Sequence, residues 1–238
     1  MQLPPGLDRL WSSEEPSKGR RGGLNLDKVV TAAVELADAE GLDAVSMARV
    51  AKALGFTTMS LYRHVRSKEE LLVLMLDRVM VMPPVAPYAS WREGLAGWAW
   101  DLLRMVREHP WVHYVRISPP PATPSSVTLM ERGLAPLSDT GLAEQDKAHL
   151  ILMLNGYVFW MARLETELAP GTGDPATDPL VAYITVMHTL VDDRWPAVKR
   201  AVEGGVFDDQ EDTRDADFQF GLDRILDGIE ALIEAEDS

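Results

Sequence analysis

Apolar residues recur at helical spacing along most of the chain, and residues that favour helix ends separate the runs. The first run, from Leu26 to Glu40, stops at Gly41, a residue type that commonly terminates helices. Ser46 and Ser67 stand where the N-cap residues of two later helices would stand. The pattern predicts N-terminal helices over 26–40, 47–54, 57–64 and 68–82.

The prolines that follow residue 82 interrupt this pattern and mark a boundary between a small N-terminal part and a larger second part. Beyond them every segment again has a helical pattern, and we recognise neither a strand nor an internal repeat. The helices expected there cover 90–108, 111–117, 124–137, 142–168, 180–191, 196–203 and 216–234. The chain is therefore expected to be all-α.

One segment has the spacing of a helix-turn-helix motif. Two helices cross steeply only if a small residue lies at their contact and a flexible residue makes the turn, and Ala51 and Gly55 meet these needs. Val50, Leu54 and Leu61 would hold the pair together from inside, so the second helix would point outward, toward a DNA major groove. An ordinary helical hairpin with the same small residues is the alternative.

Polar side chains around the second helix of the motif suit contacts with DNA. Hydroxyl groups in its first turn can reach base edges, and the hydroxyl, imidazole and ammonium groups that follow can reach one phosphate strand. A basic cluster near the N-terminus suits a minor-groove arm. The candidate DNA-binding residues are Lys18, Arg20, Arg21, Ser46, Thr57, Thr58, Ser60, Tyr62, His64 and Lys68. Their alternative roles are a solvated basic run, helix caps, a packed aromatic ring and a surface histidine.

The net charge of −14 argues against a nucleic-acid partner until its distribution is considered. Residues 1–80 carry 11 Lys or Arg and 11 Asp or Glu, so the whole net charge lies in residues 81–238. An acidic second part repels DNA, whereas a neutral N-terminal part can approach it. The distribution is therefore compatible with the helix-turn-helix interpretation.

The N-terminal motifs closely resemble the DNA-binding domain of TetR-family regulators. The resemblance runs through an ordered set of motifs: Ala39-Glu40-Gly41-Leu42, Val45-Ser46-Met47, Val50-Ala51 with Leu54-Gly55, Met59-Ser60-Leu61-Tyr62-Arg63-His64-Val65 and Ser67-Lys68-Glu69-Glu70-Leu71. It implies a three-helix helix-turn-helix DNA-binding domain over 24–82, preceded by a flexible basic arm over 1–23.

The second part, over 88–238, resembles the C-terminal domain of the branch that includes the tetracycline repressor. His109-Pro110-Trp111 and the run from Phe218 to Ile229 carry this likeness. The resemblance implies a helical ligand-binding and dimerisation domain. It also implies a homodimer that reads a palindromic operator in double-stranded DNA, usually as a repressor that a small-molecule effector releases.

Dimers of the family pair two helices from each subunit, which here implies 142–168 and 216–234. The residues themselves support this pairing, because 150–161 is apolar nearly all round and such a helix must be covered on two sides. Charges placed at Leu222 and Ile229 are expected to give monomers. A fully internal core helix is the alternative.

Tryptophan and methionine side chains in the second part suit an adaptable apolar pocket. We expect a cavity of at least a few hundred Å³ bordered by the helices over 90–108, 124–137 and 142–168. The candidate ligand-binding residues are Trp98, Leu102, Met105, Met130, Leu134, Asn155, Phe159 and Arg163. Core packing or a buried dimer contact is their alternative role, and a ligand-independent DNA-binding dimer or an activator is the alternative function.

The sequence lacks the motifs that would indicate other classes of protein. The histidines show no HExxH or similar metal spacing, and there is no Gly-rich phosphate loop or nucleophile elbow, so we expect no enzyme, metal site or cofactor. The absence of cysteine excludes a disulfide scaffold and a thiolate zinc site. No signal peptide or membrane-spanning run is recognised, so we expect a soluble, cytoplasmic protein with no membrane partner.

Overall fold

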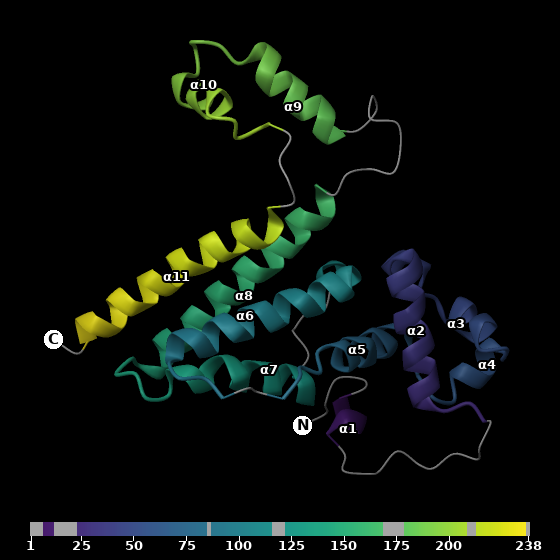
Figure 1. The fold of residues 1–238 in the computed structure, drawn as a ribbon. Coiled ribbons are helices and arrows are strands. Elements are labelled where there is room, and N and C mark those ends of the chain that lie inside the picture. The colour runs from purple at the N-terminus through teal and green to yellow at the C-terminus, as the bar shows by residue number, and fades with distance from the viewer. Residues whose placement is uncertain are drawn as a thin grey trace. The chain divides into compact units, whose positions relative to one another are not determined.

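The computed structural model describes residues 7–11, 23–84, 87–115, 122–168, 179–208 and 213–236. The regular elements of these residues are all helices, and no strand occurs among them, which confirms the predicted all-α class (Figure 1). The chain forms two compact units. The first comprises Met1–Ala162 with Ile225–Ser238, and the second comprises Arg163–Arg224.

The N-terminal helices follow the apolar pattern of the sequence. They are α2 (Leu26–Glu40), α3 (Met47–Ala53), α4 (Thr58–Leu61) and α5 (Lys68–Val79), with a short unpredicted helix, α1 (Leu7–Leu10), before them and a 3-10 turn, η1 (Leu42–Ala44), after α2. The side chains of Asn25, Ser46, Thr57 and Ser67 cap α2 to α5 by accepting a backbone N–H of the first turn. These caps fix the helix starts close to the predicted ones, whereas α4 and α5 end three residues earlier than predicted.

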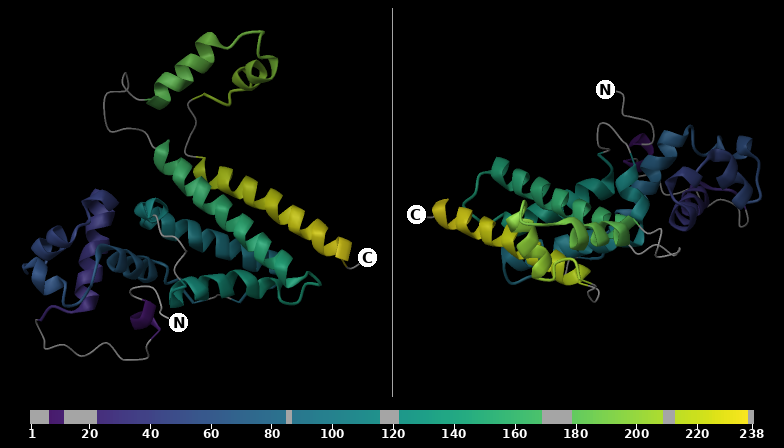
Figure 2. Two further views of the ribbon diagram at one scale, coloured as in Figure 1. Left: turned by 180° about the vertical axis from the view of Figure 1, so that it is seen from behind. Right: turned by 90° about the horizontal axis from the view of Figure 1, so that it is seen from above.

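The described residues of the larger part form α-helices and two short 3-10 turns. In order they are α6 (Trp91–Glu108), η2 (Pro110–Tyr114), α7 (Pro124–Leu134), η3 (Ala135–Leu137), α8 (Glu144–Glu167), α9 (Pro179–Leu190), α10 (Pro196–Glu203) and α11 (Arg214–Glu236). Figures 1 and 2 show α8 and α11 running side by side. Among the described residues, no helix combines the length and apolar character needed to cross a membrane.

Prolines explain two differences from the predicted helices. In the segment predicted as a helix over 111–117, the residues up to Tyr114 form the 3-10 turn η2, and 116–117 lie outside the described residues. Pro110 is in the first turn of η2, and His109 lies outside the helical region at φ −129° and ψ 68°. The helix predicted over 124–137 ends at Leu134 and continues as η3. Pro136 causes this change because it has no N–H to donate to the preceding turn.

Close contacts between α6, α7 and α8 depend on two glycines. A Cβ atom on Gly94 of α6 would lie 2.7 Å from Pro136 Cγ and 2.8 Å from Pro136 Cβ. A Cβ atom on Gly133 of α7 would lie 3.1 Å from Ile151 Cδ1 and 3.2 Å from Trp98 Cε2. A larger residue at position 94 would therefore force a shift at Pro136, whereas one at position 133 would require the side chains of Ile151 and Trp98 to give by a few tenths of an ångström.

Arg92, near the start of α6, fixes the end of α11 by ion pairs. Its guanidinium lies 2.6 Å from Asp227 Oδ1 and 3.4 Å from Glu230 Oε2. Leu226 and Ile229 of the same stretch of α11 are buried. The end of α11 is thus held by buried apolar residues and by a charged contact at the surface.

Replacing Gly94 with alanine is expected to lower the free energy of unfolding. Pressing a Cβ atom into Pro136 costs about 1–3 kcal/mol, and the better helix propensity of alanine offsets about 1 kcal/mol of this. Gly97→Ala is the matched control, since it lies on the same helix and no atom lies within 4 Å of its added Cβ. Urea unfolding followed by tryptophan fluorescence should show a loss for the first variant and a gain for the second; equal gains would contradict the packing argument.

Candidate functional site

The helix-turn-helix is built by α3 and α4, which pack against each other across a tight turn. Ala51 is buried at the crossing, as predicted from its small size. Gly55 makes the turn with φ +73°, a conformation that side chains with a Cβ rarely adopt. The backbone N–H of Phe56 closes the turn by donating to Ala51 O at 2.9 Å. This geometry turns the start of α4 away from α3.

Hydroxyl groups gather at the N-terminus of α4. Thr57 caps the helix by accepting Ser60 N at 3.3 Å, and the hydroxyl oxygens of Thr57 and Ser60 lie 3.0 Å apart. Thr57 is exposed, whereas Thr58 and Ser60 are half-buried. The structure therefore brings these three predicted DNA-binding residues together on one short turn.

The predicted phosphate-binding residues follow directly in the chain. Tyr62 is exposed, His64 is half-buried, and Lys68 is exposed at the first position of α5. The turn that carries them is anchored by Glu70, a fully buried residue whose Oε2 accepts Arg66 N at 2.6 Å. A fixed turn of this kind holds the positions of side chains on both sides of it.

Ser46 has a structural role that the sequence also indicated. Its hydroxyl caps α3 by accepting Arg49 N at 3.2 Å. The guanidinium of Arg49 is bonded to both carboxylate oxygens of Glu40, at 2.6 and 2.7 Å, and this hydrogen bond and charge lower the pKa of Glu40. A contact of Ser46 with DNA stays a prediction.

Sequence reasoning missed several residues on this surface. Phe56 and Met59 are apolar but exposed, and 74% of the Met59 surface is accessible. The cations Lys52 and Arg63 are also exposed beside α4. The helix predicted over 57–64 is one turn long in the structure, and one turn cannot bury apolar residues on all of its sides, so the predicted length hid this exposure.

The predicted arm residues Lys18, Arg20 and Arg21 lie outside the described residues. Their role stays a prediction. Within the described ranges, no three His, Cys, Asp or Glu side chains are grouped so that they could hold a metal ion.

Two aspartates tie the N-terminal helices to the rest of the first unit. Asp38 Oδ1, near the end of α2, lies 2.8 Å from His109 Nδ1 and accepts Trp111 Nε1 at 2.6 Å. An ionised carboxylate has only acceptors, so the Nδ1 atom of His109 carries the hydrogen. Asp77 Oδ1 of α5 accepts Ser125 N at 2.9 Å, in the first turn of α7. The carboxylate of Asp77 thus satisfies an N–H at the positive end of α7.

The predicted ligand-binding residues do not share one environment. Trp98, Leu102 and Met105 of α6 are buried, Met130 is exposed, and Leu134, Asn155 and Phe159 are half-buried. Arg163 belongs to the second unit and pairs with Glu167 at 2.7 Å. The ligand-binding role of these residues stays a prediction.

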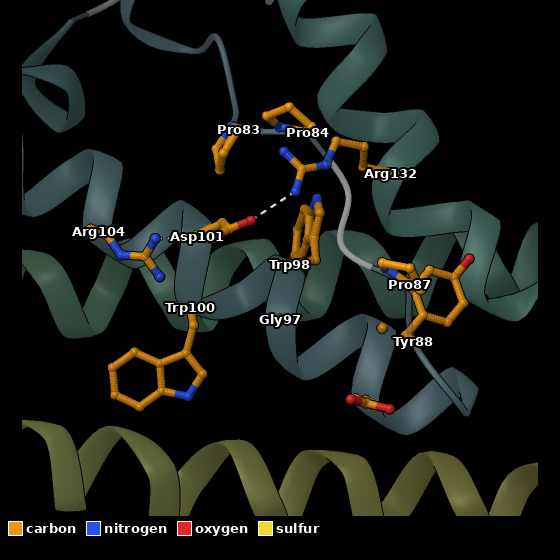
Figure 3. A pocket seen from close by; sticks show the side chains of 12 residues that line it. Pro83, Pro84, Pro87, Tyr88, Gly97, Trp98, Trp100, Asp101, Arg104 and Arg132 are labelled. Atoms are coloured by element: carbon orange, nitrogen blue, oxygen red, sulfur yellow. Dashed lines mark hydrogen bonds and ion pairs between the residues drawn. The ribbon is translucent and has the colours of Figure 1, made fainter.

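A cavity of about 360 Å³ lies beside the segment that joins α5 to α6 (Figure 3). Its walls come from prolines of that segment, from α6 and from Arg132 of α7. Trp98 alone of the predicted ligand-binding set borders it. We expected a cavity between α6, α7 and α8, and α8 contributes nothing to this one.

The helices expected to form a dimer expose apolar side chains in the single chain. On α8, 69% of Leu152 and 58% of Trp160 are accessible, and Gly156 between them is exposed. Leu222 and Ile229 of α11, by contrast, are fully buried within the subunit. Charges at these two positions would disrupt the subunit's own packing, so the expectation that they give monomers stays a prediction, and these residues are not on an exposed face of the subunit.

Comparisons with known proteins agree along nearly the whole chain. Residues 29–75 match the family described as bacterial regulatory proteins, tetR family, and residues 83–233 match the tetracyclin repressor-like C-terminal domain. The HTH-type transcriptional repressor DrrR1 of Streptomyces coeruleorubidus is 39% identical over 239 residues, covering 95% of this chain and 85% of that protein.

Solved structures of the TetR family protein ActR from Streptomyces coelicolor have the same fold. Its complex with actinorhodin has a TM-score of 0.74 and 29% identity, covering 88% of this chain and 97% of that one. Its complex with (S)-DNPA has a TM-score of 0.73 and 27% identity, covering 87% and 98%. The helix-turn-helix, the helical second part and these matches together show that the chain belongs to the TetR family and is a DNA-binding transcriptional regulator.

Proposed function

We propose that the chain is a homodimeric repressor that binds a palindromic operator through α4 of each subunit and leaves it when a small molecule binds. The observation that carries this proposal is the first turn of α4, where an exposed Thr57 and half-buried Thr58 and Ser60 place three hydroxyl groups at the positive end of the helix. The naming of DrrR1 as a repressor and the complexes of ActR with small molecules support the same regulation. The protein acts in the cytoplasm and has a regulatory rather than an enzymatic role.

In this proposal α4 enters the major groove. Thr57, Thr58 and Ser60 lie near base edges, while Tyr62, His64 and Lys68 hold the phosphate backbone. The exposed side chains of Phe56 and Met59 suit the methyl group of thymine. Ser46 at the start of α3, and the arm with Lys18, Arg20 and Arg21, complete the contacts. Two such DNA-binding domains, related by the dimer axis, meet successive major grooves roughly 34–36 Å apart.

Lys68→Ala is expected to weaken binding to all DNA sequences similarly. It should also reduce the slope of the logarithm of the binding constant against the logarithm of salt concentration by about one. Thr58→Ala should instead change the preferred bases, at a cost of about 1–3 kcal/mol for the selected operator. Fluorescence anisotropy with selected and scrambled DNA at several salt concentrations measures both effects. Arg107→Ala, which removes an exposed cation from α6, is the control. If both variants match the control, α4 is not the recognition surface.

The dimer interface in this proposal uses the exposed apolar face of α8 together with α11. Leu152, Gly156 and Trp160 recur every four residues, so they form one stripe along α8. Gly228 and Leu232 offer an exposed small and apolar surface on the last turns of α11. A second copy of the chain covers both stripes and removes this apolar surface from water.

The double variant Leu152→Glu with Trp160→Glu should sediment as a monomer and lose most of its operator affinity. Two buried charges on each side of a two-fold interface repel each other and are costly to desolvate. Val127→Glu is the control, because Val127 is an exposed apolar residue of α7 outside the proposed interface. Analytical ultracentrifugation at micromolar concentration decides the matter: a wild-type monomer, or a dimeric double variant, contradicts the proposed interface.

Asp38→Ala is expected to lower the free energy of unfolding by about 1–3 kcal/mol, because the buried N–H of Trp111 loses its acceptor. Asp43→Ala, at an exposed position of the following turn, is the matched control and should change stability little. Urea unfolding compares the two variants. Equal midpoints would show that the contact between Asp38 and the indole contributes no net stability.

A further inference from the structure

The cavity beside the segment between α5 and α6 has one flat apolar wall and one polar wall. Figure 3 shows Pro83 and Pro84 near the guanidinium of Arg132, with the indole of Trp98 next to it. Pro87 and Tyr88 lie farther along the same cavity. Rigid rings of this kind favour a planar ligand, because the side chains that line the cavity lose little conformational entropy when the ligand binds.

Arg132 supplies the polar wall with donors that the protein does not use. Its Nη2 atom donates to Asp101 Oδ2 at 2.7 Å. Its Nε and Nη1 atoms are buried and find no hydrogen-bond partner among the residues that the structure describes. Buried donors without acceptors are costly, so an oxygen acceptor that displaces the groups covering this side of the guanidinium gains hydrogen bonds that the protein leaves unmade.

The charges around Arg132 favour an acidic group. Asp101 is shared between two cations, since its Oδ1 atom also lies 3.2 Å from Arg104 Nη1. The other carboxylate of the cavity, Glu93, accepts Ala89 N at 2.7 Å and lies eight residues before Asp101, about 12 Å along the helix. Two guanidinium groups therefore face one carboxylate at this end of the cavity, which leaves a local positive charge.

Gly97 supplies the room for a ring. It borders the cavity from α6, and no atom lies within 4 Å of the position where a Cβ atom would stand. Any larger residue there would project into the space between Tyr88 and Arg104. The cavity therefore combines an open strip of helix, aromatic walls and a cationic end.

We propose that this cavity binds a planar aromatic compound that carries one acidic oxygen group, a carboxylate or a phenolate. The acidic group accepts hydrogen bonds from Arg132, and the ring lies over Gly97 beside Trp98. The inference rests on the proposed effector response and names the ligand class for it. Pro83 and Pro84 of the wall lie four and five residues after the end of α5, so occupancy of the cavity acts on the segment that leads to the DNA-binding helices.

The test is a ligand-observed NMR titration of the full chain with salicylate, a small planar aromatic acid. Saturable binding with a Kd on the order of 0.1–1 mM is expected for a ligand of this size. Benzylamine, which has a similar ring and a positive charge, should bind at least tenfold more weakly. Equal binding of the two compounds, or no saturable binding of salicylate, overturns the inference.

Two variants locate the binding. Arg132→Met should raise the Kd of salicylate about tenfold, and Gly97→Leu should do the same by filling the space over α6. Arg200→Met removes an exposed cation of α10 that does not border the cavity, so it is the matched control and should bind like the wild type. Gly97→Leu remains informative if Arg132→Met fails to fold. If neither Arg132→Met nor Gly97→Leu weakens the binding of salicylate, salicylate binds elsewhere on the protein, and this result overturns the inference.

Operator binding separates this inference from the proposed function. The titration contains no DNA, so it reports on the cavity alone. If the wild-type protein binds its operator but not salicylate, the proposed ligand class is contradicted and the proposed repressor function stands. If the protein binds salicylate in the cavity but binds no DNA, the proposed repressor function is contradicted instead.

Discussion

One carboxylate oxygen, Oδ1 of Asp38, accepts two ring N–H groups from the chain that follows α6. One of them belongs to Trp111, which is buried, so the contact cannot be replaced by water without moving the ring. Asp38 lies two residues before the end of α2, and His109 and Trp111 flank the proline that starts η2. The end of a DNA-domain helix and the end of α6 are therefore held at the same point.

Asp77 adds a second fixed point, and α5 connects it to the DNA surface. Lys68 and Asp77 lie nine residues apart on one uninterrupted helix, about 14 Å along its axis. Asp77 accepts a backbone N–H of the first turn of α7, so one helix connects that turn to the position of Lys68. A helix is stiff over this length, so a change in the larger part can alter how the smaller part meets DNA.

Local signals in the sequence were enough for the helices and for the helix-turn-helix. Ser46 and Ser67 marked helix starts because capping depends on neighbouring residues only, and Gly55 marked the turn because few residues adopt its conformation. The contact between Asp38 and Trp111 joins positions 73 apart, so no periodicity indicates it. The sequence did place Phe218, Leu222, Leu226 and Ile229 on one apolar stripe of the last helix, but it could not decide whether this stripe packs inside the subunit or against a second copy. The cavity at Arg132 depends on proline positions and on a vacant strip at Gly97, neither of which has a sequence signature.

The shortness of α4 ties DNA recognition to the folding of its surroundings. A helix of four residues has no stability of its own in water, so it exists only while the cap at Thr57 and the buried anchors Leu61 and Val65 hold it. Unfolding of the small domain therefore removes the whole DNA-binding surface of α4 at once. A substitution in its core reduces the fraction of molecules able to bind, and so lowers the apparent affinity for every operator by one factor while base preference is preserved.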